Sequence, residues 1–146
     1  MKYKFLKHTA DIKFRAYGKS LNELFENSVE ALLKSMTSDE VVEKKKKKIL
    51  AQGNDVESLL YNFLEELLIL IDSENFLVSR ANVQIDCENF DLSHSSKNQK
   101  FKLSTTLYGD DAGKYDVRTH VKAITYNEMF VKKVKNQFVC QVVVDV

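Results

Sequence analysis

The stretch Asp55–Asp72, DVESLLYNFLEELLILID, is the strongest structural signal in the sequence. Asp55 is a favourable N-cap residue, because its carboxylate can accept a hydrogen bond from a free N–H group of the first helical turn. Behind it, apolar residues recur every three or four positions, which predicts a helix with one wide apolar face. That face consists of Leu59, Leu60, Phe63, Leu64, Leu67, Leu68 and Ile71. A helix with this face must pack against a core.

A second helix is predicted upstream, over Ser20–Met36. Ser20 and Glu23 have the spacing of a capping box, and apolar residues follow at helical intervals. Between the two helices, the segment VVEKKKKKILAQG (residues 41–53) is typical of a solvated edge strand, where lysines discourage edge-to-edge pairing. Its five lysines, Lys44–Lys48, are also compatible with nucleic-acid contact, but no aromatic residues are interleaved, which favours the edge strand.

The remaining segments favour β-structure. Near the N-terminus, apolar residues at every second position predict two short strands, joined through HTAD (residues 8–11) and ended by Gly18. Downstream of the second helix, four segments are rich in Val, Phe, Thr and Tyr: residues 76–90, 100–109, 115–124 and 136–146. Polar connections separate them, at residues 89–100 and 109–115. Two helices with six to eight mostly antiparallel strands predict an α+β fold, as a single domain over residues 1–146.

Composition narrows the class of protein. The 146 residues are 44% hydrophobic and 29% charged, with a net charge of +1, so the chain as a whole is not a polycation for nucleic acid. Cys87 and Cys140 match no zinc or CxxC spacing, which favours buried thiols in a reducing compartment. The N-terminus does not resemble a secretory signal, and the longest apolar run is too short to span a bilayer. We therefore expect a cytoplasmic protein.

The last strand ends in a pair of negative charges. If the chain ends at Val146, its α-carboxylate lies beside the Asp145 side chain, and like charges that close repel each other. A hard cation such as Ca²⁺ or Mg²⁺ would relieve the repulsion, whereas the simpler alternative is a frayed, solvated terminus. Asp11 would be the third carboxylate if the first and last strands pair, which the sequence alone leaves open. For HTAD itself a polar turn is the simpler interpretation, and His8 is a second-choice ligand for such an ion.

Other candidate sites are weaker. GDDAGKYD (residues 109–116) lacks the ligand spacing of an EF-hand, and His94 and His120 have no partner at metal-ligand spacing. The glycine-rich phosphate-binding motifs and the protease and esterase signatures do not occur. Lys122 lies in KAITYNEM, where a strand is expected to end, and a half-buried lysine with a solvated ammonium is an equal alternative to a functional one.

Taken together, five segments resemble the archease family: HTADI (8–12), RAYGKSLNELFENSVEALLKSM (15–36), the segment that runs from Gly53 into the second helix, KAITYNEM (122–129) and VVVDV (142–146). They occur in the family's order and cover nearly the whole chain. The resemblance departs at two points. Asn127 stands where the family often has a histidine, which puts a titrating role at that position in doubt. Phe63 stands where the family commonly has a tryptophan, and an apolar role survives that change.

The resemblance implies a function beyond what spacing shows. Archeases are accessory proteins of the RtcB-type RNA-splicing ligase; they are not the ligase itself. They promote guanylylation of its active-site histidine and its repeated turnover, notably in tRNA splicing, so RNA and GTP are met indirectly. The family's metal site would fall on Asp11, Asp145 and Val146, with Ca²⁺ expected and Mg²⁺ or Mn²⁺ as alternatives, and its functional lysine on Lys122. Two other functions stay open: a small metal-dependent phosphoesterase, and a chaperone-like or RNA-binding module that uses the lysine run.

Overall fold

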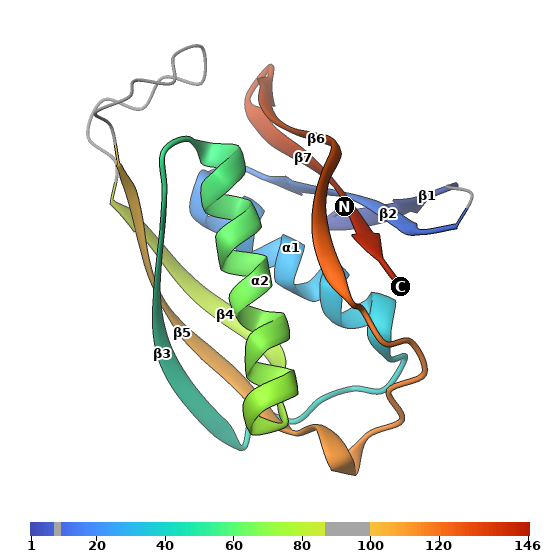
Figure 1. Cartoon of the computed structure of the whole chain (residues 1–146). Coiled ribbons are helices and arrows are strands. Elements are labelled where there is room, and N and C mark those ends of the chain that lie inside the picture. Colours follow the sequence, from blue (N-terminus) through green and yellow to red (C-terminus); the bar gives the residue numbers. More distant parts are fainter. Residues whose placement is uncertain (8–9, 87–99) are drawn as a thin grey trace.

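Two antiparallel sheets enclose two helices in the computed structural model, which describes residues 1–7, 10–86 and 100–146. Helix α1 (Leu21–Met36) and helix α2 (Val56–Glu74) lie between the sheets, and each contacts strands of both (Figure 1). The predicted α+β class is therefore confirmed, with the helices as the middle of three layers. Neither helix is long and apolar enough to cross a membrane, as far as the described residues show.

The four-stranded sheet joins the two ends of the chain. Its order is β1-β2-β7-β6, built from β1 (Tyr3–Leu6), β2 (Ile12–Gly18), β7 (Gln137–Asp145) and β6 (Ala123–Val134). The three-stranded sheet has the order β3-β5-β4, with β3 (Lys45–Gly53), β5 (Phe101–Asp111) and β4 (Phe76–Asp86). Strand β3, which carries four of the five lysines of the run, is an edge strand as the sequence predicts.

Both predicted helix starts are confirmed by their caps. The Ser20 hydroxyl accepts a hydrogen bond from the Glu23 N–H at 3.1 Å. At α2 the cap is reciprocal, because the Asp55 carboxylate accepts from the Ser58 N–H and the Ser58 hydroxyl accepts from the Asp55 N–H. Of the predicted apolar face of α2, Ile71 is half-buried and the others are buried: Leu59, Leu60, Phe63, Leu64, Leu67 and Leu68.

The predicted strand over residues 115–124 is wrong. Residues 115–122 form a connection, and β6 begins only at Ala123, so KAITYNEM starts a strand rather than ending one. The alternating pattern that suggested a strand arises because Tyr115, Val117 and Val121 pack on the core while the intervening side chains are more exposed. The N–H groups of Arg118 and Thr119 donate to the carbonyl of Met36 at the end of α1, so this segment pairs with a helix terminus.

Some sequence predictions fall partly outside the described residues. The strand expected over residues 76–90 is observed as β4 up to Asp86, and Cys87, His94 and most of the polar connection at 89–100 lie beyond it. Cys140 is described and fully buried, with its Sγ 3.3 Å from the Ser28 hydroxyl. Burial raises the pKa of this thiol to about 11, so at neutral pH it is protonated and inert, as expected for a buried structural cysteine.

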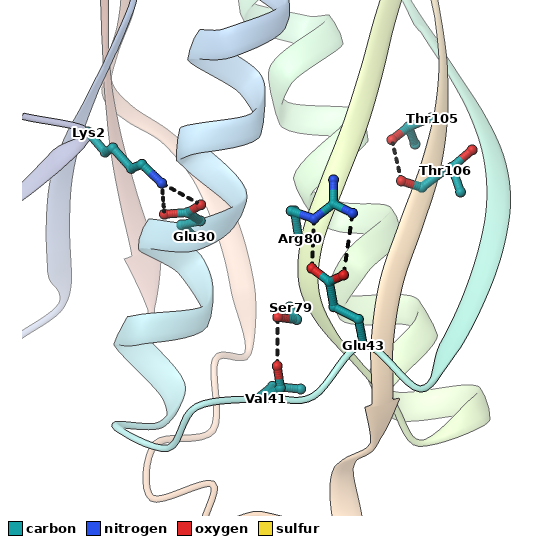
Figure 2. Close-up of polar contacts among 8 residues, drawn as sticks. All are labelled: Lys2, Glu30, Val41, Glu43, Ser79, Arg80, Thr105 and Thr106. Atoms are coloured by element: carbon teal, nitrogen blue, oxygen red, sulfur yellow. Dashed lines mark hydrogen bonds and ion pairs between the residues drawn. The ribbon is translucent and has the colours of Figure 1, made fainter.

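Polar contacts link the connection between α1 and β3 to strand β4, and the N-terminal segment to helix α1 (Figure 2). The Arg80 guanidinium on β4 forms an ion pair with Glu43 at 2.7 Å, and the Ser79 hydroxyl donates to the Val41 carbonyl at 2.9 Å. These two contacts hold the segment between α1 and β3 against β4. Lys2 reaches Glu30 on α1 at 3.1 Å and fastens the N-terminus in the same way. Such exposed pairs set position more than they add stability.

Gly109 lies in β5, the central strand of the three-stranded sheet, where the backbone of β4 leaves no room for a side chain. A Cβ built at this position would lie 2.0 Å from the backbone carbonyl oxygen of Leu77 on β4, near the irregularity in the β4–β5 register between Val78 and Arg80. Because that oxygen belongs to the backbone of a strand hydrogen-bonded to β5, it cannot move aside without disturbing the sheet. Gly113, four residues later, has only side-chain atoms nearby, the nearest at 3.4 Å.

We predict that Gly109→Ala lowers the free energy of unfolding by about 1–3 kcal/mol, because the added methyl group forces β4 and β5 apart. Gly113→Ala is the matched control and should change it by less than about 0.5 kcal/mol. Urea denaturation of both variants measures the difference. Equal stability of the two variants would show that the close approach at Gly109 is not a constraint.

Candidate metal-binding edge of the four-stranded sheet

The β2–β7 ladder brings the segments that carry the predicted Asp11 and Asp145 to one end of the four-stranded sheet. Ile12 pairs with Val144 in an antiparallel register, Asp145 is the last residue of β7, and Asp11 lies in the bend directly before β2. Along β2, the side chains of Phe14 and Ala16 are buried against the helices, whereas that of Lys13 is not. Asp11 precedes Lys13 by two residues, so continued alternation would place its side chain on the same outward face as Lys13. The pairing of β2 with β7 thus brings the segments that carry Asp11 and Asp145 to the same end of the sheet, with both residues just beyond the last pair of the ladder.

A third segment meets the same end of the sheet. The Lys122 N–H donates to the Asp145 carbonyl at 2.8 Å, and Ala123 pairs with Asp145 in the β6–β7 ladder. The Lys122 side chain is exposed and makes no ion pair or hydrogen bond within the described residues, so it is not the half-buried lysine considered above. Val146 follows directly and is partly buried against the core.

The donor set of this edge fits a hard cation by its chemistry. Asp11 and Asp145 would offer carboxylate oxygens from two neighbouring strands, and such oxygens are the ligands that Ca²⁺ and Mg²⁺ prefer. Among the described residues, no group of three or more His, Cys, Asp and Glu side chains could hold a metal ion. A site here therefore needs a further donor, for which the Val146 carboxylate is placed next in the chain, or a cation that keeps much of its water shell.

The other acidic motif of the sequence is structural. Asp110 is buried, and its carboxylate accepts hydrogen bonds from the Asp111 N–H at 2.8 Å and the Tyr115 hydroxyl at 2.8 Å, with Lys114 at 3.4 Å. The Tyr115 hydroxyl in turn accepts from the Val42 N–H. Because every contact favours the charged form, chiefly the Asp111 N–H and then Tyr115, the pKa of the Asp110 carboxyl is lowered. This carboxylate holds a turn, as expected for a segment without EF-hand spacing.

The two positions that depart from the archease pattern have different surroundings. Phe63 is fully buried and stacks on Phe25 of α1, with ring centroids 5.8 Å apart, so its role is to fill the core. Asn127 is exposed in an irregular part of β6, where the register on β7 shifts between Thr125 and Phe130. Its backbone N–H donates to the Thr125 hydroxyl. His120 is exposed on the connection before β6, while His8 and Thr9 lie outside the described residues.

Sequence reasoning missed an aromatic pair beside this edge. Tyr126 of β6 stacks on Tyr61 of α2, with ring centroids 4.2 Å apart and planes within 6° of parallel. Burial raises the pKa of both hydroxyl groups, with Glu65 adding to the effect at Tyr61. Tyr126 remains 53% exposed, so the pair is partly accessible at the surface. The available signal was the tyrosine in KAITYNEM, but its partner lies 65 residues earlier and only the fold reveals it.

The fold is that of a small α+β protein in which the first and last segments of the chain pair within one four-stranded sheet. The model of the archease protein family matches residues 3–146. The archease of Sulfurisphaera tokodaii is 40% identical over 146 residues, covering 99% of both chains, and that of Pyrococcus abyssi is 39% identical over 144 residues, covering 95% and 94%. The solution structure of Methanobacterium thermoautotrophicum protein 1598 superposes with a TM-score of 0.78 at 26% identity, covering 99% of both chains. The chain belongs to the archease family.

We predict that Asp110→Asn lowers the melting temperature at pH 7, and that the difference from the parent protein shrinks in acid. The pKa of Asp110 is lowered on folding, so its stabilising contribution is present above the unfolded value of about 3.9 and is lost as the pH falls through the lower folded value. Melting curves between pH 7 and pH 2 measure this. Asp116→Asn, which removes only an exposed pair with Arg118, is the control and should have little effect.

Proposed function

We propose that the chain is a non-catalytic activator of an RtcB-type RNA-splicing ligase, which promotes guanylylation of the ligase and its repeated turnover in tRNA splicing. Membership of the archease family over residues 3–146 supports this proposal. The observation that supports it in the structure is the pairing of β2 and of β6 with β7, which brings the segments that carry Asp11, Asp145 and Lys122 to one end of the sheet. An activator of a cytoplasmic ligase would itself act in the cytoplasm.

In this proposal the acidic edge binds one divalent cation, Ca²⁺ in the first instance, with Mg²⁺ and Mn²⁺ as alternatives. The Asp11 and Asp145 carboxylates and the terminal carboxylate of Val146 are the proposed ligands. A bound cation would supply positive charge that offsets the negative charge of the nucleotide triphosphate in the ligase. Lys122 has an exposed ammonium at the same edge and would contact phosphate or a carboxylate of the ligase. The chain's own part is to hold these groups on a rigid ladder at fixed spacing.

The first prediction is that Asp11→Asn and Asp145→Asn each abolish stimulation of ligase guanylylation while the fold stays intact. Asn keeps the shape of the side chain but removes the charge that attracts the cation. The measurement is incorporation of labelled GMP into the ligase, with and without the variant, across several divalent cations. The control is Asp72→Asn, which removes an exposed carboxylate of α2 outside the proposed site. This variant should stimulate like the parent protein.

Full stimulation by both variants would contradict the metal-edge proposal. The isolated protein should also leave RNA and nucleotide phosphoesters intact, and hydrolysis that disappears in Asp11→Asn would point to the phosphoesterase alternative instead.

A second prediction concerns the end of the chain. Adding Gly-Ser after Val146 converts its carboxylate to a neutral amide, so we expect the affinity for Ca²⁺ to fall about tenfold or more, as for the loss of one supporting group of a metal site. Calorimetric titration of the isolated protein measures this. The same two residues added before Met1, which is 89% exposed, serve as the control. Unchanged affinity in the C-terminal extension would remove Val146 from the ligand set.

A further inference from the structure

The outward face of the four-stranded sheet also carries a hollow of about 800 Å³. It lies at the end of the sheet that bears the β6–β7 hairpin, whereas the C-terminus marks the opposite end of β7 (Figure 1). Four cations from β2, the turn after it, β6 and the hairpin line the hollow: Arg15, Lys19, Lys132 and Lys135. Glu23 is the one carboxylate among the lining residues.

Side-chain contacts position two of these cations, Arg15 and Lys132. The Arg15 Nε donates to the Gln141 side-chain oxygen at 3.0 Å, and the Gln141 amide nitrogen donates to the Glu128 carbonyl at 2.8 Å. Gln141 is 5% exposed, so the guanidinium is positioned by a group that cannot move freely. Arg15 and Lys132 both lie over the ring of Phe130, at 5.6 Å and 4.6 Å from its centroid. The fold thus gathers two positive charges around one aromatic ring.

Although Glu23 lines the same hollow, neither it nor any other carboxylate in the described part of the chain forms an ion pair with these four cations. Lys19, Lys132 and Lys135 form no ion pair there, and the polar partner of Arg15 is the neutral amide of Gln141. Like charges held together raise the local potential, and an anionic ligand would lower it. In the lysine run on β3, Lys47 is paired with Glu74 of α2, whereas Lys46 and Lys48 are exposed and form no ion pair among the described residues.

The shape and lining of the hollow indicate the kind of anion. Its cations are spread over four segments rather than converging on one point, which suits a chain of phosphates better than a single phosphate. Half-buried Tyr17 and Phe130 lie between them. A positive groove with aromatic rings is the combination that binds single-stranded nucleic acid, whereas lysines are depleted from interfaces between proteins. We propose that this hollow binds single-stranded RNA through its phosphates.

The hollow and the acidic edge lie on the same face. The β2–β7 ladder runs from the pair Ile12–Val144 to the pair Gly18–Phe138, so the two sites are about 20 Å apart along the strands. An RNA strand in the hollow would then lie near the edge proposed to meet the ligase. The choice of RNA over DNA rests on the proposed function, but binding itself needs neither the ligase nor the metal.

The test is the binding of a fluorescein-labelled single-stranded RNA of about 12 nucleotides to the isolated protein, followed by anisotropy over a salt series. If all four cations contact phosphates, the logarithm of the affinity should fall against the logarithm of salt concentration with a slope of about −2.8. The double variant Lys132→Thr with Lys135→Asn should bind more weakly, with a slope of about −1.4. Asn suits position 135 because Lys135 has a positive φ of 58°.

The matched control is Lys46→Thr with Lys48→Thr, which removes the same charge from the outward face of the other sheet and should bind like the parent protein. Lys19→Ser, at an exposed turn residue, is a second hollow variant and should also weaken binding. Circular dichroism verifies that every variant is folded. Three results would overturn the proposal: full binding by the hollow variants, an equal loss in the lysine-run control, or equally tight binding of a polyglutamate peptide.

Failure here is distinguishable from failure of the proposed function. Ligase guanylylation measured without RNA should respond normally to the Lys132→Thr, Lys135→Asn variant. It should not respond to Asp11→Asn.

Discussion

The antiparallel pairing of β2 with β7 is the constraint on which the rest of the molecule depends. One side of this ladder is fully buried against the helices, through Phe14 and Ala16 on β2 and Cys140 and Val142 on β7. A slip of one residue would turn these side chains outward and charged ones inward, so the register is firmly specified. The same register fixes what appears on the outward side. It sets Ile12 against Val144 at the end that lies next to Asp11 and Asp145, and Arg15 against Gln141 further along.

The helices owe their unusual apolar content to their place between two sheets. A helix on one face of a single sheet needs one apolar stripe, whereas α2 is covered on both sides and also buries Val56 and Leu70. The stack of Phe25 on Phe63 connects the two helices within the middle layer. Because no helix of the described residues covers the outward face of the four-stranded sheet, we expect this face to be available for polar chemistry at both of its ends.

Strand β6 is the least regular strand of this sheet, and its irregularity serves the outward face. Its register on β7 shifts between Thr125 and Phe130, and Glu128 has a positive φ of 56°. This bulge brings the Glu128 carbonyl to Gln141 and its carboxylate to within 3.6 Å of the Lys13 ammonium. Gln141 is thereby fixed, and with it Arg15. Bulges commonly redirect side chains in this way, and alternating hydrophobicity carries little sign of them.

The sequence by itself determined both helices, their caps, the edge position of β3 and the α+β class, because these depend on local hydrogen bonding and on the period of apolar residues. It also singled out Asp11, Asp145 and Lys122 as residues of interest. Only the tertiary structure decided that the segments carrying them come to one end of the sheet, since strand pairing between residues more than 130 positions apart leaves no local trace. The same reason explains the misplaced start of β6, the unforeseen stack of Tyr61 on Tyr126, and the basic hollow, whose four cations become neighbours only once both ends of the chain share one sheet.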